Sequence, residues 1–392
     1  MTKKVFIIDG KRTPVGSFQG SLSSLTAPQL GAEVVKDLIK RNNLAPDSID
    51  EVIFGNVLSS GIGQAPARQT AIYAGLSDKT EALTINKMCG SGLKAVMLAQ
   101  QAILCEDADL IIAGGIESMS KAPYIIKNAR NGLRLGHGTI LDSVIYDGLW
   151  DVYNNIHMGN CAELTAKEFN LSRQELDEFA IESYKRAINA QESGKFLEEI
   201  TKIEIKDKNS VILVDKDEEP QKVKFDKIPS LKPAFDKNGI VTAANSSKLN
   251  DGAAAVIVAS QEKVDELGLK PRFEIIGQAS FAKDPIHFTT APADAIKKLL
   301  NKTKLSINDI DLFEINEAFA VVSIVVNRLL GLDPIKVNVN GGAVAIGHPI
   351  GASGARILTT LMYEMERRNS EFGVASLCIG GGEASAILIK KA

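Results

Sequence analysis

Cys89 is the residue best suited to covalent chemistry, and it lies in the stretch Lys-Met-Cys-Gly-Ser-Gly at 87–92. The apolar run 82–85 precedes it, and apolar residues at helical spacing follow it over 93–104. A cysteine where a strand turns into a helix meets unpaired N–H groups and the positive end of the helix dipole, which favour the nucleophilic thiolate. The alternative is a structural role, because small buried cysteines also occur at helix starts.

His348 is the candidate base for this thiol. It is one of four histidines and lies in the glycine-rich segment 338–354, held between Gly347 and Pro349 just before a helical pattern. A single histidine more often has a structural or solvated role. A phosphate-binding loop would also be rich in glycine, but the chain has no Gly-Lys-Ser/Thr sequence here and no dinucleotide fingerprint.

A second cysteine, Cys378, ends an apolar run and opens the sequence Cys-Ile-Gly-Gly-Gly at 378–382. Asn316 follows another apolar strand, where its amide either faces a site or caps a helix, and Glu317 either anchors backbone or acts on substrate. A thiol, a base and glycine-rich N–H donors suit acyl transfer through a thioester. Hydrolysis would need only one cysteine, so the second predicts that a further proton is moved.

The elements that would position these groups alternate between strands and helices over residues 5–118. We expect a helix at 28–41 and, besides the strand before Cys89, strands at 5–9, 51–57 and 110–113, the last closed by Gly114-Gly115. This alternation predicts an α/β fold with a largely parallel sheet. Residues 119–249 lack this alternation of strands and helices. They are predicted to form an insertion, with a helix at 172–193 and a charged stretch at 206–227.

The last third of the chain repeats the first. Residues 38–50 match 299–311 at a constant offset of 261, and Gly114–Glu117 matches Gly380–Glu383. We therefore expect two similar halves that share one site between them. The predicted units are 1–118 plus 250–270, the insertion 119–249, and 271–392.

The composition argues against several classes of protein. The 392 residues are 45% hydrophobic and 24% charged, with a net charge of -3 and 5% aromatics, which gives neither a basic surface nor many stacking platforms for nucleic acid. No apolar run approaches the roughly 20 residues of a membrane span. Four scattered cysteines without a Cys-x-x-Cys pair indicate neither a disulfide framework nor a zinc site. We expect a cytoplasmic protein with no nucleic-acid, membrane or metal partner.

Taken in order, the motifs of this chain closely resemble those of the thiolase family, and the resemblance covers essentially the whole sequence. They are Arg12-Thr-Pro-Val-Gly16, the Cys89 loop, His157-Met-Gly159, Asn245–Ala255, Asn316-Glu-Ala-Phe-Ala320, Gly347-His-Pro349 and Cys378-Ile-Gly-Gly-Gly382. The resemblance implies two five-stranded α/β halves in an α-β-α-β-α sandwich. It also implies that residues 119–249 form a loop domain that covers coenzyme A.

The resemblance further implies a reversible ping-pong reaction, acetyl-CoA C-acetyltransferase, which joins two acetyl-CoA into acetoacetyl-CoA and CoA. Cys89, deprotonated by His348, would accept the acyl group, and Cys378 would remove the α-proton of the second acetyl-CoA. His348 and a water held by Asn316 would form one oxyanion hole, and the N–H groups of Cys89 and Gly380 the other. CoA thioesters enter as substrates, and no permanently bound cofactor or metal is implied.

By the same resemblance, several residues line the path of the CoA moiety: Leu149, Phe235, Ala243, Ser247, Ala318 and Phe319. Lys222 and Lys224 are expected to meet the CoA phosphates, although a solvated charge run is the alternative. The pair His157-Met158 resembles the short-chain type, in which the methionine narrows the acyl pocket. The alternative for Met158 is gap filling in a core.

Three places depart from the family pattern, one of them Val321-Val322, which replaces the more usual polar residue after the Asn316–Ala320 motif. Lys248 stands where the motif usually has glycine, and Glu383-Ala384 follows the third glycine-rich loop where relatives often keep another glycine. The family also suggests a homodimer or homotetramer, with residues 119–140 as a contact loop.

Two other functions stay open at this point. One is a degradative 3-ketoacyl-CoA thiolase of broader chain length. The other is a non-catalytic relative that binds CoA or lipid, which predicts that the nucleophile or base is missing. Cys89, His348 and Cys378 are all present, so the sequence favours the enzyme.

Overall fold

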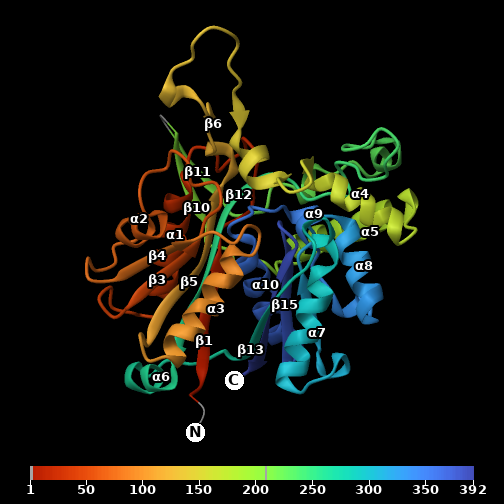
Figure 1. The fold of residues 1–392 in the computed structure, drawn as a ribbon. Helices are drawn as coiled ribbons and strands as arrows, with labels where there is room; N and C mark the ends of the chain where they lie inside the picture. The colour runs from red at the N-terminus through yellow and green to blue at the C-terminus, as the bar shows by residue number, and fades with distance from the viewer. Residues whose placement is uncertain (1–2, 208–209) are drawn as a thin grey trace.

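The fold is built around one mixed sheet that continues through both halves of the chain (Figure 1). The computed structural model describes residues 3–207 and 210–392. The strands run in the order β14 (Leu312–Ile315), β15 (Phe372–Ile379), β16 (Glu383–Lys391), β13 (Phe273–Ala282), β1 (Val5–Arg12), β12 (Asn250–Ser260), β5 (Leu110–Ser118), β3 (Glu51–Gly55) and β4 (Glu81–Ile85). The short β2 (Gly16–Ser17) pairs with the start of β12.

The prediction of a largely parallel sheet is wrong. Only β3–β4, β3–β5 and β14–β15 are parallel, and the other pairs of this sheet are antiparallel. One cause is that β12 returns from the segment 119–249 and inserts between β1 and β5 in the opposite direction. The other is the tight turn at Gly381 and Gly382, whose φ angles of 94° and 86° let β15 fold back into β16.

Gly114 and Gly115 lie inside β5 and do not close it, which corrects the predicted strand end. Their lack of side chains permits close packing. A Cβ on Gly114 would lie 2.0 Å from the carbonyl oxygen of Ala254 on β12, and one on Gly115 would lie 2.0 Å from that of Gly351. The strand therefore continues beside β12 to Ser118.

Helices in three layers alternate with the two parts of the sheet, so the predicted five-layer α-β-α-β-α sandwich is confirmed (Figure 1). The outer layers hold α1 (Ala27–Arg41) and α2 (Pro66–Tyr73) on one side and α7 (Ala291–Thr303) and α8 (Ala320–Leu330) on the other, with α3 (Ser91–Leu104) and α10 (Ser353–Arg368) packed together between them. Three apolar clusters fill the space between the layers, one beneath each outer helix layer and one around the central helices α3 and α10. The second half has four named strands, not five; Val337 occupies the remaining position through an isolated parallel bridge to Phe313.

The helices that carry the layers follow from local sequence. Thr26 and Gln29 form a capping box at the start of α1, and Pro28 fits the first turn, where no N–H is required. Leu30, Val34 and further apolar residues of α1 then face the sheet.

The segment 119–249 contains short strands and two longer helices that lie across one end of the sandwich (Figure 1). They are β6 (Tyr124–Ile125), β7 (Leu141–Asp142), β8 (Trp150–Asp151), β9 (Ile156–His157), α4 (Met158–Glu168), α5 (Arg173–Glu192), β10 (Ile203–Asp207) and β11 (Ser210–Val214). The predicted helix at 172–193 corresponds to α5, with Ser172 as its N-cap. Residues 208 and 209 of the predicted charged stretch lie outside the described residues. The remaining α-helices of the described residues are α6 (Gln261–Leu267) and α9 (Ala343–Ile346).

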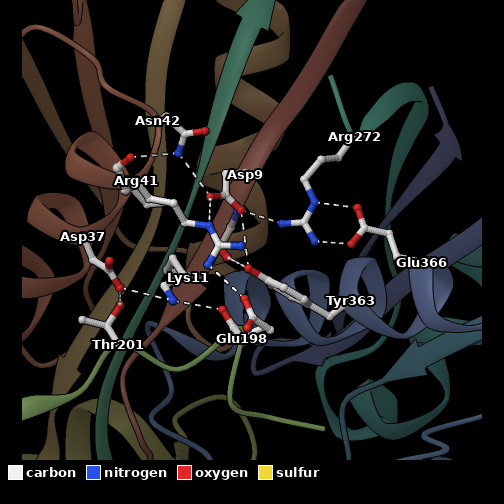
Figure 2. Close-up of polar contacts among 12 residues, drawn as sticks. Asp9, Lys11, Asp37, Arg41, Asn42, Glu198, Thr201, Arg272, Tyr363 and Glu366 are labelled. Atoms are coloured by element: carbon white, nitrogen blue, oxygen red, sulfur yellow. Dashed lines mark hydrogen bonds and ion pairs between the residues drawn. The ribbon is translucent and has the colours of Figure 1, made fainter. Parts of the chain in front are cut away.

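A buried carboxylate, Asp9, joins the two halves (Figure 2). It pairs with Arg41 of α1 at 3.1 Å and with Arg272 next to β13 at 2.5 Å. The Tyr363 hydroxyl of α10 lies 3.5 Å away, and Arg272 also binds Glu366. Arg41 and Arg272 share the carboxylate of Asp9, so this cluster of ion pairs connects the first half of the chain to the second.

Among the described residues, no helix combines the length and apolarity needed to cross a membrane.

Candidate active site

Cys89 lies in the turn between β4 and α3, as predicted. The preceding Met88 has a φ of 47°, and the Ser91 hydroxyl fixes the turn by accepting from the Lys87 N–H at 2.8 Å and donating to the Met88 carbonyl at 2.6 Å. Only 6% of Cys89 is exposed, and the residue belongs to the apolar cluster between the two halves.

The environment of the Cys89 thiol differs from the sequence expectation. Burial raises its pKa to about 11 and outweighs the hydrogen bonds from the N–H groups of Gly380 and Cys89 itself, which lower it. The thiol form therefore dominates at neutral pH. The same two N–H groups are directed at Sγ, so they stabilise the thiolate as it forms.

Cys378 ends β15 and is brought to the Cys89 turn. A Cβ on Gly90 would lie 2.3 Å from Cδ1 of Ile379, so the two loops are in direct contact. Cys378 has no exposed surface. Burial raises the pKa of Cys378 well above the usual value, and a negative charge on Cys89 raises it further. Ionisation of one thiol therefore disfavours ionisation of the other.

An ion pair between Lys87 and Glu383 also links these loops, and the sequence reasoning missed it. Lys87 precedes the Cys89 turn and Glu383 follows the Cys378 loop. Lys87 lies two residues before Cys89 and Glu383 five residues after Cys378, and their opposite charges are the only signal in the sequence, because the contact depends on the fold.

His348 is held in one orientation by groups on both sides. Its backbone N–H donates to Oδ1 of Asn250 at 2.9 Å, and its Nδ1 lies 2.5 Å from Oγ of Ser353. The Ser353 hydroxyl also donates to the Pro349 carbonyl at 2.9 Å, which leaves its oxygen to accept from Nδ1–H. Nε2 is then the unprotonated nitrogen, and it is buried without a bond to any described residue.

The His348 ring is neutral at physiological pH. Burial lowers its pKa to about 3, with a further contribution from the positive charge of Arg356. A neutral imidazole is the form that accepts a proton. Its loop also touches the Cys89 helix, because a Cβ on Gly92 would lie 3.0 Å from the Gly351 carbonyl oxygen.

Asn316 lies beside this histidine, with its Nδ2 3.5 Å from Nδ1 of His348. Its Oδ1 is buried and has no partner among the described residues. Asn316 is not the cap of α8, since Phe319 holds that position. Glu317, in contrast, accepts from the Val344 N–H at 3.2 Å, from Asn338 and from Ser183, which supports the anchoring role for its carboxylate.

Met158 begins α4 and packs against the Cys378 loop. A Cβ on Gly380 would lie 3.1 Å from its Cε and 3.4 Å from its Sδ. Both residues, with Met88 and Phe288, line a pocket of about 470 Å³, and Met88 and Gly380 are close neighbours of Cys89 and Cys378 in the sequence. The methionine thus limits the room next to the candidate nucleophile.

Aromatic side chains continue from Met158 along the segment 119–249. The His157 ring stacks on Phe235 with centroids 4.7 Å apart, and Phe235 meets the edge of Phe319 at 6.0 Å. The Ser247 N–H donates to the Ala318 carbonyl at 3.0 Å. Four of the predicted CoA-path residues therefore lie together: Phe235, Ser247, Ala318 and Phe319.

The other predicted CoA-path residues are more scattered. Leu149 packs against the apolar cluster that contains Cys89, and Ala243 is exposed. Lys222 and Lys224 are exposed, and the ammonium of Lys222 already contacts Ser17. Among residues 3–207 and 210–392, no group of His, Cys, Asp and Glu side chains is arranged to hold a metal ion.

Two family models match this chain: the thiolase N-terminal domain over residues 5–262 and the thiolase C-terminal domain over residues 269–391. The chain belongs to the thiolase family. Among the similar curated thiolases, the acetyl-CoA acetyltransferase of Allochromatium vinosum is 49% identical over 393 residues, with both chains covered completely. That of Cupriavidus necator is 50% identical over 389 residues, covering 99% of each chain.

Solved thiolase structures share the fold over the full length. The acetyl-CoA acetyltransferase of Bacillus anthracis matches with a TM-score of 0.97 and 41% identity, covering 100% of this chain and 99% of its own. A thiolase from Ascaris suum in complex with coenzyme A matches with a TM-score of 0.95 and 45% identity, covering both chains completely.

Proposed function

We propose that this thiolase is an acetyl-CoA C-acetyltransferase that condenses two acetyl-CoA into acetoacetyl-CoA and CoA and also runs in reverse. The observation that carries the proposal is the convergence of two cysteine loops and the His348 loop between the two halves. Full-length similarity to acetyl-CoA acetyltransferases supports the same reaction.

In the first half-reaction, Sγ of Cys89 attacks the thioester carbon of acetyl-CoA while Nε2 of His348 takes the thiol proton. The carbon–sulfur bond to CoA breaks, and the CoA thiolate receives that proton from His348. The proton moves to His348 as the bond between Sγ and the acyl carbon forms, because the free protein holds a neutral imidazole and a neutral thiol. The N–H groups of Cys89 and Gly380 stabilise the negative oxygen.

In the second half-reaction, the thiolate form of Cys378 removes a proton from the α-carbon of a second acetyl-CoA. The carbanion attacks the acetyl carbon on Cys89, and the bond to Sγ breaks. The departing Cys89 thiolate takes up the proton held by Cys378, which returns to its thiolate form. A high pKa suits this task, since a thiolate that is hard to form is a strong base. His348 and Asn316 would hold the enolate oxygen, His348 by donating from Nε2 in the tautomer that carries its proton there, and Asn316 through a water bound to Oδ1. Neither Nε2 nor Oδ1 has a partner among the described residues, and both are buried.

The two thiols are coupled electrostatically. A negative charge on Cys89 raises the pKa of Cys378, so the two sulfurs do not readily ionise together. An acylated Cys89 cannot ionise, and Cys378 is then the one of the pair that can form a thiolate. CoA thioesters are substrates in this scheme, and the aromatic and Ser247–Ala318 contacts on the segment 119–249 form the proposed CoA path.

We expect acetoacetyl-CoA to be cleaved by CoA at least ten times faster than a 3-ketoacyl-CoA of ten carbons, in kcat/KM. The physical reason is that Met158 packs directly on Gly380 and leaves little room for a longer acyl chain. Thiolysis rates measured across chain lengths decide the question. Faster cleavage of the longer substrate would favour the degradative, broad-specificity alternative.

We further propose that the protein assembles as a homodimer or homotetramer. Strand β4 is the last strand of the sheet and lacks a neighbour on its outer side within the described chain, and Leu83 on it is 42% exposed. The loop 119–140 adds exposed apolar side chains, including Tyr124 and Leu135. Light scattering is expected to give two or four chains, whereas a monomeric mass at micromolar concentration would refute the assembly.

We also propose a cytoplasmic location, which the unbridged cysteines support. Cys89, Cys105, Cys161 and Cys378 are all unbridged, and reducing compartments keep thiols in this form. The proposed domain units remain 1–118 plus 250–270, 119–249 and 271–392, with β12 as the strand that returns the chain to the first unit.

A further inference from the structure

Lys248 is the lysine that stands where the family motif usually has glycine, and its side chain turns inward. Its Nζ donates to the carbonyl oxygen of Ser246 at 2.7 Å and to that of Val344 at 3.2 Å. It also lies over the ring of Tyr184, 5.6 Å from the centroid. The three donors of the ammonium are thus directed at two carbonyls and one aromatic face.

These two carbonyls belong to segments with different proposed tasks. Ser246 precedes Ser247, which is part of the proposed CoA path, and it bridges to Phe319. Val344 lies in α9, which ends directly before Gly347 and His348. One ammonium therefore connects the CoA-facing segment to the segment that carries the candidate base.

We propose that Lys248 is a positioning residue, whose charged ammonium holds the CoA-facing segment at Ser246–Ser247 against α9 and thereby supports CoA binding. This inference rests on the proposed function. A glycine at this position has no side chain to make the connection.

The charge state of Lys248 depends on groups from several elements. Glu219 before the 3-10 helix at Pro220–Lys222 and Glu317 after β14 favour the charged form, and Tyr184 faces it from α5. Helix α9 contributes only apolar side chains. Burial outweighs the carboxylates and lowers the pKa of Lys248 to about 8. The ammonium is therefore present below pH 8 and is lost as the pH rises through that value.

The test compares Lys248→Met and Lys248→Arg with the unchanged protein. Lys248→Met is expected to weaken CoA binding in calorimetry about tenfold at pH 7 and to raise the KM for CoA similarly, with kcat changed less than threefold. The unchanged protein should lose CoA affinity between pH 7 and 9, Lys248→Met should lack this loss, and Lys248→Arg should retain tight binding up to pH 9. Lys40→Met, which removes an exposed lysine on α1, is the matched control and should resemble the unchanged protein.

The outcomes separate this inference from the proposed function. If the unchanged protein fails to cleave acetoacetyl-CoA, the proposed function fails, while CoA calorimetry still reports on Lys248. If Lys248→Met lowers only the melting temperature and leaves CoA affinity and its pH dependence unchanged, the ammonium is merely structural and the inference is overturned. If Lys248→Met does not fold, methylammonium restoring CoA binding to Lys248→Ala supports the inference, and no restoration contradicts it.

Discussion

Replacing Cys89 with serine is expected to reduce acetoacetyl-CoA thiolysis on the order of 10⁴-fold. A serine hydroxyl is a much weaker nucleophile than a thiolate, and His348 is held too weakly basic to activate it, with its pKa lowered to about 3. The N–H groups of Cys89 and Gly380 would remain, so substrate affinity should change little. Steady-state kinetics with acetoacetyl-CoA and CoA measure the loss.

The matched control for this change is Cys105→Ser. Cys105 is exposed at the end of α3, the helix that follows Cys89, and plays no part in the proposed site. It should keep full activity. A Cys89→Ser protein that folds normally and retains activity within tenfold of the original would remove Cys89 from the role of nucleophile.

The second large effect is expected for Cys378→Ala, which should separate the two half-reactions. Acylation of Cys89 by acetyl-CoA should persist, because its nucleophile, base and N–H donors are untouched. Condensation and thiolysis should fall by about 10³-fold, since no group then exchanges a proton with the α-carbon. Release of CoA in a single burst, without formation of acetoacetyl-CoA, is the measurable sign.

Cys161→Ala controls for the small cavity that this substitution leaves. Cys161 is likewise fully buried, and burial raises its pKa to about 12. It lies in α4, and its thiol donates to Oδ2 of Asp151 at 3.8 Å. It should retain both half-reactions. Equal losses in both variants would attribute the effect to packing and not to proton transfer.

Local features of the site could be predicted from the sequence, because short-range patterns determine them. The apolar run before Cys89 and the helical spacing after it correspond to β4 and α3, and the glycine turn after Cys378 precedes β16. The duplication also indicated that the loops of both halves meet. That prediction needed only the repeat, since similar halves place equivalent turns at the same end of their sheets.

Features that depend on distant contacts could not be predicted in the same way. The alternation of apolar and polar residues along a strand does not specify the direction of the strand. The antiparallel placement of β12 between β1 and β5 therefore could not be predicted. The Cys89 pKa was expected to fall at a helix start, but residues from the second half bury the thiol and raise it. The Lys87–Glu383 ion pair and the inward course of Lys248 likewise exist only in the folded chain.

The most direct test of the account is to locate the acyl group on the Cys378→Ala protein after incubation with acetyl-CoA. Intact-mass analysis followed by peptide mapping should show one added acetyl group per chain, on the peptide that contains Cys89. It should be absent when Cys89 is also replaced by serine. An acetyl group found on any other residue, or no acetylation of a folded Cys378→Ala protein, would contradict the assignment of Cys89 as the acyl carrier and Cys378 as the separate base.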